Sequence, residues 1–461
     1  MTTEKNKFTL WVLAWPIFIE LTLQLLLGTV DTLMVSRVSD DAVAVVGLSN
    51  QLFQALTTLF MTVASGAGIL IAQKLGARKA EDARTVAIMA VKVSAVIGML
   101  LSIVLHFGAR PLAQVFQLEE RLLPLADTYI SIVGGGMVLT ALMASLSTVI
   151  RNTGNTKGPM ITALGMNVIH VFFNYGFIFG SYGFPKLGLT GVAISTLVSR
   201  LLATGFLLFM FTSAFDRKIQ FMDWRIFHRK LFGEVLKIGW PLGVNMSSYV
   251  FTQLAMYTFL AMLGAKELAT RTYMNTLESS CSMLGFALSL AMQIQIAHLY
   301  GGGRIREAYK SSYRGLWIGL GLATGSSVIL LLVSKQYLGI FTADPEIITL
   351  GLSCIAMNLL LQPGKMLNMG IGSALNAVGD TRYNMYISIG SMWMVAAGLS
   401  YLLGIHLSWG LMGIYVAMIC DEYLRGVLVL YRWRGQKFLR KGLPSSEASS
   451  VSQGPGTTAQ A

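Results

Sequence analysis

The sequence predicts an all-α integral membrane protein whose twelve transmembrane helices form two parallel six-helix lobes. Three observations support this prediction. The 461-residue chain is 54% apolar and only 12% charged, whereas soluble domains carry about 25% charged residues. Apolar stretches of membrane-spanning length recur along the chain. Residues at corresponding positions of the two halves also match at one constant shift.

The apolar stretches are each about 20 residues or longer, which is enough to cross a hydrocarbon core of roughly 30 Å. They are continuously apolar rather than alternating, which argues against a transmembrane β-barrel. In chain order, the predicted spans are 11–36, 44–72, 86–108, 121–148, 159–180, 189–212, 231–262, 268–297, 312–334, 347–373, 384–404 and 410–431.

The first span could instead be a cleaved signal peptide, because Lys5 and Lys7 precede it. It is too long for a signal peptide, contains Glu20 and Asp31, and ends without a small-residue cleavage site. We therefore interpret it as the first transmembrane helix.

Lysine and arginine are unequally distributed between the two sides of the predicted topology. One side has 23 of them, including Lys5, Lys7 and those of the 213–230 segment, and the other side has seven, among them Arg271. Cytoplasmic loops carry the excess of basic residues, so we expect both termini to be cytoplasmic and the protein to lie in the inner (plasma) membrane. The net charge of +13 then reflects topology and predicts no nucleic-acid partner.

The internal repeat has a shift of 225 residues. Ala14-Trp15-Pro16 recurs as Gly239-Trp240-Pro241, and the same shift relates Gly76 to Gly301 and Thr156 to Thr381. Six spans per unit make the two units parallel, with a substrate site expected between the halves near the midplane. The predicted division is an N-terminal lobe (1–212), a cytoplasmic linker (213–230), a C-terminal lobe (231–435) and a disordered tail (436–461).

Sequence motifs for enzymatic or ATP-driven chemistry are absent. The chain has no G-x-x-x-x-G-K-[ST] phosphate loop, no H-E-x-x-H, no G-x-S-x-G and no cysteine pair at zinc spacing. We therefore predict that the protein is not an enzyme, has no cofactor or resident metal, and uses an ion gradient. A passive channel is the alternative that conductance measurements would reveal.

Ionisable residues inside predicted spans are candidates for function, because charge in the hydrocarbon region is costly. In the first half, Asp31, Asn174 and Thr196 are expected roughly 9 to 12 Å below the outer boundary, at 1.5 Å per residue. His170 shares a helix face with Asn174, one turn deeper. The four residues could form one ion and substrate site, or Asp31 and His170 could be a structural buried pair.

Further candidates have other expected roles. Pro16 would provide a hinge if it lies inside the first helix rather than at its first turn. In the second half Met256 aligns with Asp31, so that half lacks this acid. It instead contains Glu278 and Lys365, for which an ion pair of either structural or functional role is plausible. The cluster Asp421, Glu422 and Arg425 also lies within a predicted span.

Several short motifs together resemble the multidrug and toxic compound extrusion (MATE) family. They are the Trp-Pro opening of both lobes, Val30-Asp31-Thr32-Leu33-Met34, the Arg151 to Lys157 element, Gly379-Asp380-Thr381-Arg382, and Phe177-Ile178-Phe179-Gly180. The resemblance extends over about residues 8–435.

The resemblance implies a secondary antiporter that exports cationic amphipathic compounds in exchange for H⁺ or Na⁺ as the two lobes rock. It assigns the coupling acid of the DinF-like branch to Asp31, the helix bend to Pro16 and a hydroxyl to Thr196. That branch usually has Asn-x-x-x-Asp in the fifth helix, where this chain has His170 and Asn174. A missing carboxylate weakens a Na⁺ site of hard oxygen ligands, whereas histidine can carry a proton.

We therefore favour H⁺ over Na⁺ as the coupling ion, and we expect a monomer in the lipid bilayer with a small cationic or amphipathic substrate. The alternative within the same superfamily is a flippase for lipid-linked saccharides, which would need several cationic residues in its cavity. Only Arg200 and Lys365 are candidates for such residues.

Overall fold

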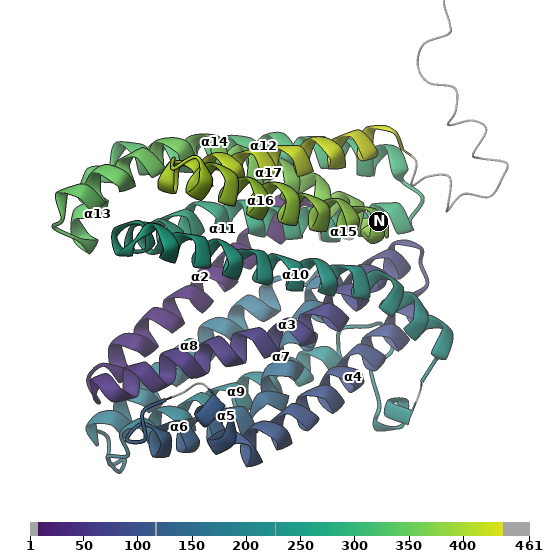
Figure 1. The fold of residues 1–461 in the computed structure, drawn as a ribbon. Helices are drawn as coiled ribbons and strands as arrows, with labels where there is room; N and C mark the ends of the chain where they lie inside the picture. Colours follow the sequence, from purple (N-terminus) through teal and green to yellow (C-terminus); the bar gives the residue numbers. More distant parts are fainter. Residues whose placement is uncertain (1–7, 116–117, 226, 437–461) are drawn as a thin grey trace, which may run out of the picture. The chain divides into compact units, whose positions relative to one another are not determined.

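The computed structural model describes residues 8–115, 118–225 and 227–436. Of the predicted tail, only Gln436 falls within these ranges, and Lys5 and Lys7 also lie outside them. The described residues are almost entirely helical (Figure 1). Contacts divide the chain into unit 1 (Met1–Ser248 and Phe286–Ser311) and unit 2 (Tyr249–Gly285 and Ser312–Ala461).

The first half of the chain forms six spans and several short helices. Its elements are α2 (Leu10–Val35), α3 (Asp40–Gly76), α4 (Ala80–Phe107), α5 (Ala109–Val115), α6 (Leu123–Tyr129), the π-helix η1 (Ile130–Gly134), α7 (Met137–Asn152), α8 (Lys157–Phe179), α9 (Leu189–Thr212) and the 3-10 helix η2 (Phe221–Arg225).

The second half repeats this order of spans. Its elements are α10 (Arg229–Leu263), α11 (Ala265–Gly301), α12 (Ile305–Leu332), α13 (Ser334–Phe341), α14 (Pro345–Ala377), α15 (Thr381–Ser391), η3 (Met392–Ala397), α16 (Gly398–Ser400), η4 (Tyr401–His406) and α17 (Gly410–Arg434). The π-helices η3 and η4 continue α15 into one span that ends at His406.

Twelve membrane-spanning helices are confirmed. In the described ranges, nine helices are long and apolar enough to cross a membrane, and the pair Leu123–Gly134 and Met137–Asn152 adds a tenth span bent by 41°. The bend lies at Gly134-Gly135-Gly136, and a Cβ at Gly136 would lie 2.0 Å from a Leu197 methyl carbon. The helices α10 and α17, with 35 and 25 residues, are also long enough to cross a membrane and bring the number to twelve, but they do not reach the same apolar content and low charge as the other ten.

Each compact unit has its own buried apolar core. The core of unit 1 contains Phe53, Phe60, Tyr129 and Ile130, and that of unit 2 contains Met274, Leu277 and Cys354. The boundary between the units does not follow the predicted 213–230 linker, because α10 and α11 each contribute residues to both units. The division of the chain into two six-helix lobes therefore stays a prediction.

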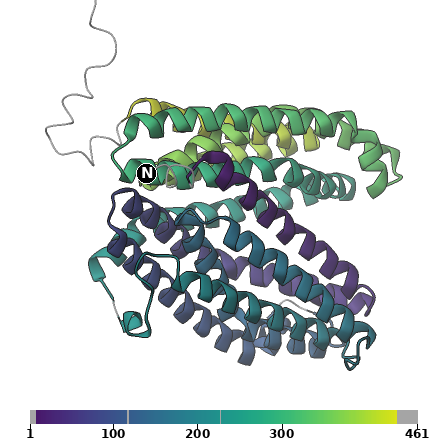
Figure 2. The ribbon, with the colours of Figure 1, turned by 180° about the vertical axis from the view of Figure 1, so that it is seen from behind.

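Within unit 1, α2 lies along α8, and α3 and α4 both pack on α7 (Figures 1 and 2). Local sequence defines the helix ends. Ser39 caps α3 by accepting a hydrogen bond from the Ala42 N–H (3.0 Å), and Gly180 ends α8 with φ of 69°. These ends set the lengths of the helices that carry the candidate site.

Candidate functional site

The helices α2 and α8 are connected by three polar contacts that follow their common interface. In each, a side chain of α8 or its N-terminal cap donates a hydrogen bond to α2. The contacts are Thr156 Oγ1 to the Val12 carbonyl (3.3 Å), Asn167 Nδ2 to the Leu23 carbonyl (2.8 Å) and Asn174 Nδ2 to Asp31 Oδ1 (2.9 Å).

Pro16 lies in the interior of α2, six residues after its first residue Leu10. Proline has no backbone N–H, so the hydrogen bond that would close on the carbonyl four residues earlier is missing. That carbonyl belongs to Val12, the residue that Thr156 contacts. The structure thus meets the condition under which the sequence predicts a hinge at Pro16.

The four residues predicted for one site lie together inside unit 1. Asp31 accepts from Asn174, and His170, one turn earlier on α8, lies 3.2 Å from the Thr196 hydroxyl on α9. His170, Asn174 and Thr196 are buried, and Asp31 is partly buried. Among the described contacts, Asp31 and His170 have different partners, Asn174 and Thr196, and no direct bond joins them.

Two buried acceptor atoms in this cluster have no partner among the described residues: Asn174 Oδ1 and His170 Nδ1. The Thr196 hydroxyl donates to the Val192 carbonyl (3.0 Å). It therefore accepts from His170 Nε2, which leaves the lone pair of Nδ1 free. Buried acceptors without donors are unfavourable, so the cluster has room for a further hydrogen-bond donor.

Arg200 lies on α9 one turn beyond Thr196 and brings a positive charge to this cluster. Its Nη1 donates to Thr140 Oγ1 on α7 (2.9 Å), and its charge interacts with that of Asp31. The sequence identified Arg200 as a charge within a span but did not place it near Asp31. The Thr140 contact joins two helices that pack together but are not consecutive in the chain, and no local sequence pattern reveals such a contact.

Two of the 30 cations counted above as loop residues, Arg151 on the predicted cytoplasmic side and Arg271 on the other, are buried. Arg151 Nη1 lies 3.3 Å from Glu20 Oε2, and Arg271 Nη1 lies 2.9 Å from Glu278 Oε1. Each buried carboxylate in a span has a buried guanidinium as its partner, which compensates the cost of removing both charges from water. Arg271 could have been recognised, because it lies inside the predicted 268–297 span, two turns before Glu278.

The second-half candidates form a cluster in unit 2, and the ion pair expected between Glu278 and Lys365 is present. The Lys365 Nζ to Glu278 Oε2 distance is 3.3 Å, and Tyr415 donates its hydroxyl to Glu278 Oε1 at 2.6 Å. With Arg271, three donors converge on one carboxylate that is 2% exposed. Sequence reasoning did not identify Tyr415.

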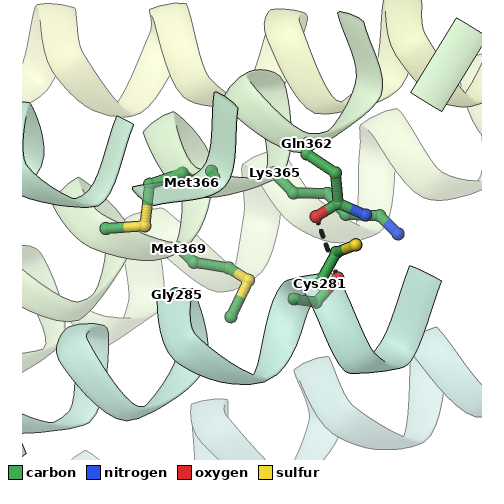
Figure 3. A pocket seen from close by; sticks show the side chains of 8 residues that line it. Cys281, Gly285, Gln362, Lys365, Met366 and Met369 are labelled. Atoms are coloured by element: carbon green, nitrogen blue, oxygen red, sulfur yellow. Dashed lines mark hydrogen bonds between the residues drawn. The ribbon is translucent and has the colours of Figure 1, made fainter. Parts of the chain in front are cut away.

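Lys365 also borders a small cavity between α11, α12 and α14 (Figure 3). Met366, Met369 and Gln362 line it, and Gln362 Oε1 accepts a hydrogen bond from Ser282 (2.9 Å). Its volume of about 10 Å³ is close to the minimum that holds one water molecule. The cavity is too small for an amphipathic organic substrate.

A much larger open cavity of about 660 Å³ lies in unit 1 on the exposed side of α2. Leu21, Leu25 and Leu33 provide its apolar walls, and Gln24, Thr32 and Gln54 provide uncharged polar groups. Its volume lies within the range of about 300 to 1,000 Å³ typical of small-molecule sites. Asp31 is not among the lining residues, and its neighbour in the chain, Thr32, is.

The MatE family model matches this chain twice, at residues 16–176 and 241–402. The two matches begin at Pro16 and Pro241, the positions that the internal repeat aligns.

Similar proteins extend over nearly the whole chain. The "Uncharacterized transporter YisQ" of Bacillus subtilis is 35% identical over 436 residues, 95% of this chain and 96% of its own. The "Probable multidrug resistance protein NorM" of Thermotoga maritima is 26% identical over 442 residues, 94% of each. A crystal structure of MATE in the bent conformation has a TM-score of 0.86 at 17% identity, over 94% of this chain and 96% of that one.

Proposed function

Because this chain belongs to the MatE family of transporters, we propose that it is a secondary antiporter exporting cationic amphipathic compounds in exchange for H⁺. Relatives named as multidrug resistance proteins support drug export. In this proposal Asp31 carries the coupling proton, Pro16 is the hinge, and the protein works as a monomer by alternating access.

The main support for the proposal is that the hydrogen-bonding groups of Asn174 are complementary to those of a protonated Asp31. With Asp31 ionised, Asn174 Nδ2 donates to it, while Asn174 Oδ1 has no donor among the described residues. A protonated carboxyl group has an O–H that can donate to this oxygen while still accepting from Nδ2. The amide and the acid would then form two hydrogen bonds, so the site stabilises the proton-loaded form.

The same donor set favours H⁺ over Na⁺. Sodium prefers several hard oxygen ligands, and here Asp31 is the one carboxylate of the cluster, with a nitrogen of His170 in place of a further oxygen.

Exchange follows if the proton and the substrate favour opposite states of α2. Asp31 is partly buried, and its ionised form would attract a cationic substrate held in the cavity that Thr32, its neighbour in the chain, helps to line. Protonation removes that attraction and alters the contact with Asn174. The proton and the substrate then shift the same two-state equilibrium of α2 in opposite directions, as antiport requires.

We further propose that the protein lies in the plasma membrane with both termini and the 213–230 segment in the cytoplasm, as the distribution of basic residues suggests. Single cysteines at Lys218 and Ser181 should then react with impermeant reagents from opposite faces. Labelling of both from outside would refute this orientation.

The direct test is Asp31→Asn, which keeps the size of the side chain but fixes it neutral. We expect the variant to fold and reach the membrane, and to lose gradient-driven export of a fluorescent cationic dye. Asp40→Asn, at the exposed start of α3, is the matched control and should export normally. If Asp31→Asn exports at the wild-type rate with unchanged pH dependence, Asp31 is not the coupling residue, and Glu278 and Lys365 become the next candidates.

A further inference from the structure

We propose that Thr156 is a positioning residue for transport, because its hydroxyl fastens the Pro16 break of α2 to the start of α8. This inference rests on the proposed function and assigns a role to the Arg151–Lys157 element. The argument has four steps, each from contacts within one unit.

The first step is the free carbonyl of Val12. In an α-helix each carbonyl accepts from the N–H four residues later, and for Val12 that residue is Pro16. The Val12 carbonyl therefore needs another donor, because an unpaired backbone acceptor inside a membrane protein is costly. Thr156 Oγ1 lies 3.3 Å from it and is the donor that the structure provides.

The second step is that the Thr156 hydroxyl is not used to cap its own helix. Thr156 is the N-cap residue of α8, yet its side chain makes no capping hydrogen bond. Asn155 instead accepts from the Gly158 N–H at 3.0 Å. Thr156 is 2% exposed, so its hydroxyl is directed into the α2–α8 interface rather than toward solvent.

The third step is the position of Thr156 relative to the proposed ion site. Thr156 and Asn174 lie at opposite ends of α8, and they contact α2 at Val12 and Asp31. When protonation alters the Asp31 contact, the contact at Val12 still anchors the break in α2. When the Asp31 contact changes, α2 therefore bends at Pro16 rather than sliding as a whole along α8.

The fourth step is a comparison with the other half of the repeat. Thr381 occupies the position of Thr156, is 1% exposed, and its hydroxyl has no partner among the described residues. The same half has Met256 in place of Asp31. The hydroxyl contact thus occurs in the half of the chain that has the acid.

The test compares Thr156→Val, which keeps the branched shape and removes the donor, with Thr156→Ser, which keeps the donor. We expect Thr156→Val to lower the pH-driven export rate about threefold to tenfold, as for loss of one hydrogen bond. Hydrogen exchange of the α2 amides before Pro16 should become faster. Thr156→Ser should restore both values to within about twofold of wild type.

Thr381→Val is the matched control, because it removes a buried hydroxyl at the repeat position that has no described partner. It should leave the export rate and the hydrogen exchange of the α2 amides unchanged. If Thr156→Val and Thr381→Val reduce export equally, the effect is general destabilisation, and the proposal is wrong.

Pro16→Ala provides a second, independent arm, because an alanine at this position restores an N–H that can donate to the Val12 carbonyl. In this background Thr156→Val should no longer accelerate exchange of the α2 amides. Equal acceleration in the wild-type and Pro16→Ala backgrounds would overturn the inference.

The outcome also separates this inference from the proposed function. Loss of export in Asp31→Asn with wild-type behaviour of Thr156→Val would leave the antiporter proposal intact and refute the role of Thr156. Normal export in Asp31→Asn would refute the coupling proposal, while the exchange measurements would still report whether Thr156 holds the Pro16 break.

Discussion

Glu278 is the most heavily compensated carboxylate of unit 2, with Arg271, Lys365 and Tyr415 all donating to it. Glu278→Gln would remove the single negative charge and leave two cations in the membrane interior. Breaking a buried ion pair on one side costs roughly 3 to 5 kcal/mol. We expect a clear loss in thermal unfolding temperature of the detergent-solubilised protein.

The control for Glu278 is Glu346→Gln. Glu346 also pairs with a lysine, Lys266, but its side chain is 70% exposed, and exposed ion pairs contribute about 0 to 1 kcal/mol. If both variants lose the same stability, burial does not determine the contribution of the Glu278 cluster.

Asp223, in the segment between the two halves, gives a prediction about pH. The backbone N–H of Gln220 (2.8 Å), together with the guanidinium of Arg84, holds the pKa of the Asp223 carboxyl below its ordinary value of 3.8. Folding therefore favours the ionised form. The resulting stabilisation is present above about pH 4 and is lost as pH falls through the lowered pKa of the folded state.

Asp223→Asn should accordingly unfold at a lower temperature than wild type at pH 7, and the difference should shrink as pH approaches 3. Asp216→Asn, at an exposed position of the same segment, should follow the wild-type curve throughout. A wild-type to Asp223→Asn difference that does not change with pH would contradict the role of the ionised carboxyl.

At the scale of residues, the sequence predicted which polar side chains of the first half lie together better than it predicted the partners of the charged ones. Asp31, His170, Asn174 and Thr196 were grouped from helix depth alone, because topology and rise per residue fix depth. Partners such as Tyr415 for Glu278, or Thr140 for Arg200, come from helices distant in the chain. Such contacts depend on helix rotation, which periodicity in a uniformly apolar span does not define.

At the scale of helices, α3 and α11 meet through two glycines of the internal repeat. A Cβ at Gly76 would lie 2.0 Å from the His298 carbonyl oxygen, and a Cβ at Gly301 would lie 1.9 Å from that of Gln73. Gln73 and His298 are themselves 225 residues apart. The two contacts are therefore equivalent under the repeat, and both bring backbone against backbone within unit 1.

Gly76→Ala and Gly301→Ala should each force these helix ends apart. Overpacking of this kind typically costs about 1 to 3 kcal/mol, which we expect as a lower unfolding temperature. Gly205→Ala on α9 is the control, because a Cβ there would meet nothing within 4 Å. Equal behaviour of all three variants would show that the close approach does not contribute to stability.

The helices themselves were predictable, and their irregularities were less so. The span predicted at 121–148 has a 41° bend between η1 and α7. The span predicted at 384–404 contains two π-helical segments. Hydropathy measures length and apolar content, whereas these features depend on how a particular helix packs. The consecutive glycines 134–136 were the available signal for the bend.

At the scale of the whole molecule, the two halves share one order of spans but not one set of candidate functional residues. The repeat preserves Pro16 and Pro241, while Asp31 is replaced by Met256. The proposed proton site and the large cavity on α2 both lie in unit 1, whereas unit 2 has the Glu278 cluster, in which one carboxylate contacts two cations. We infer that the halves diverged in chemistry while keeping the fold.

The most direct test of this account measures dye export by the purified protein in proteoliposomes, with pH and sodium gradients imposed separately. We predict that a pH gradient drives export in sodium-free buffer, that a sodium gradient without a pH gradient does not, and that Asp31→Asn abolishes the pH-driven component. Export that strictly requires Na⁺ would contradict the assignment of Asp31 and Asn174 as a proton site.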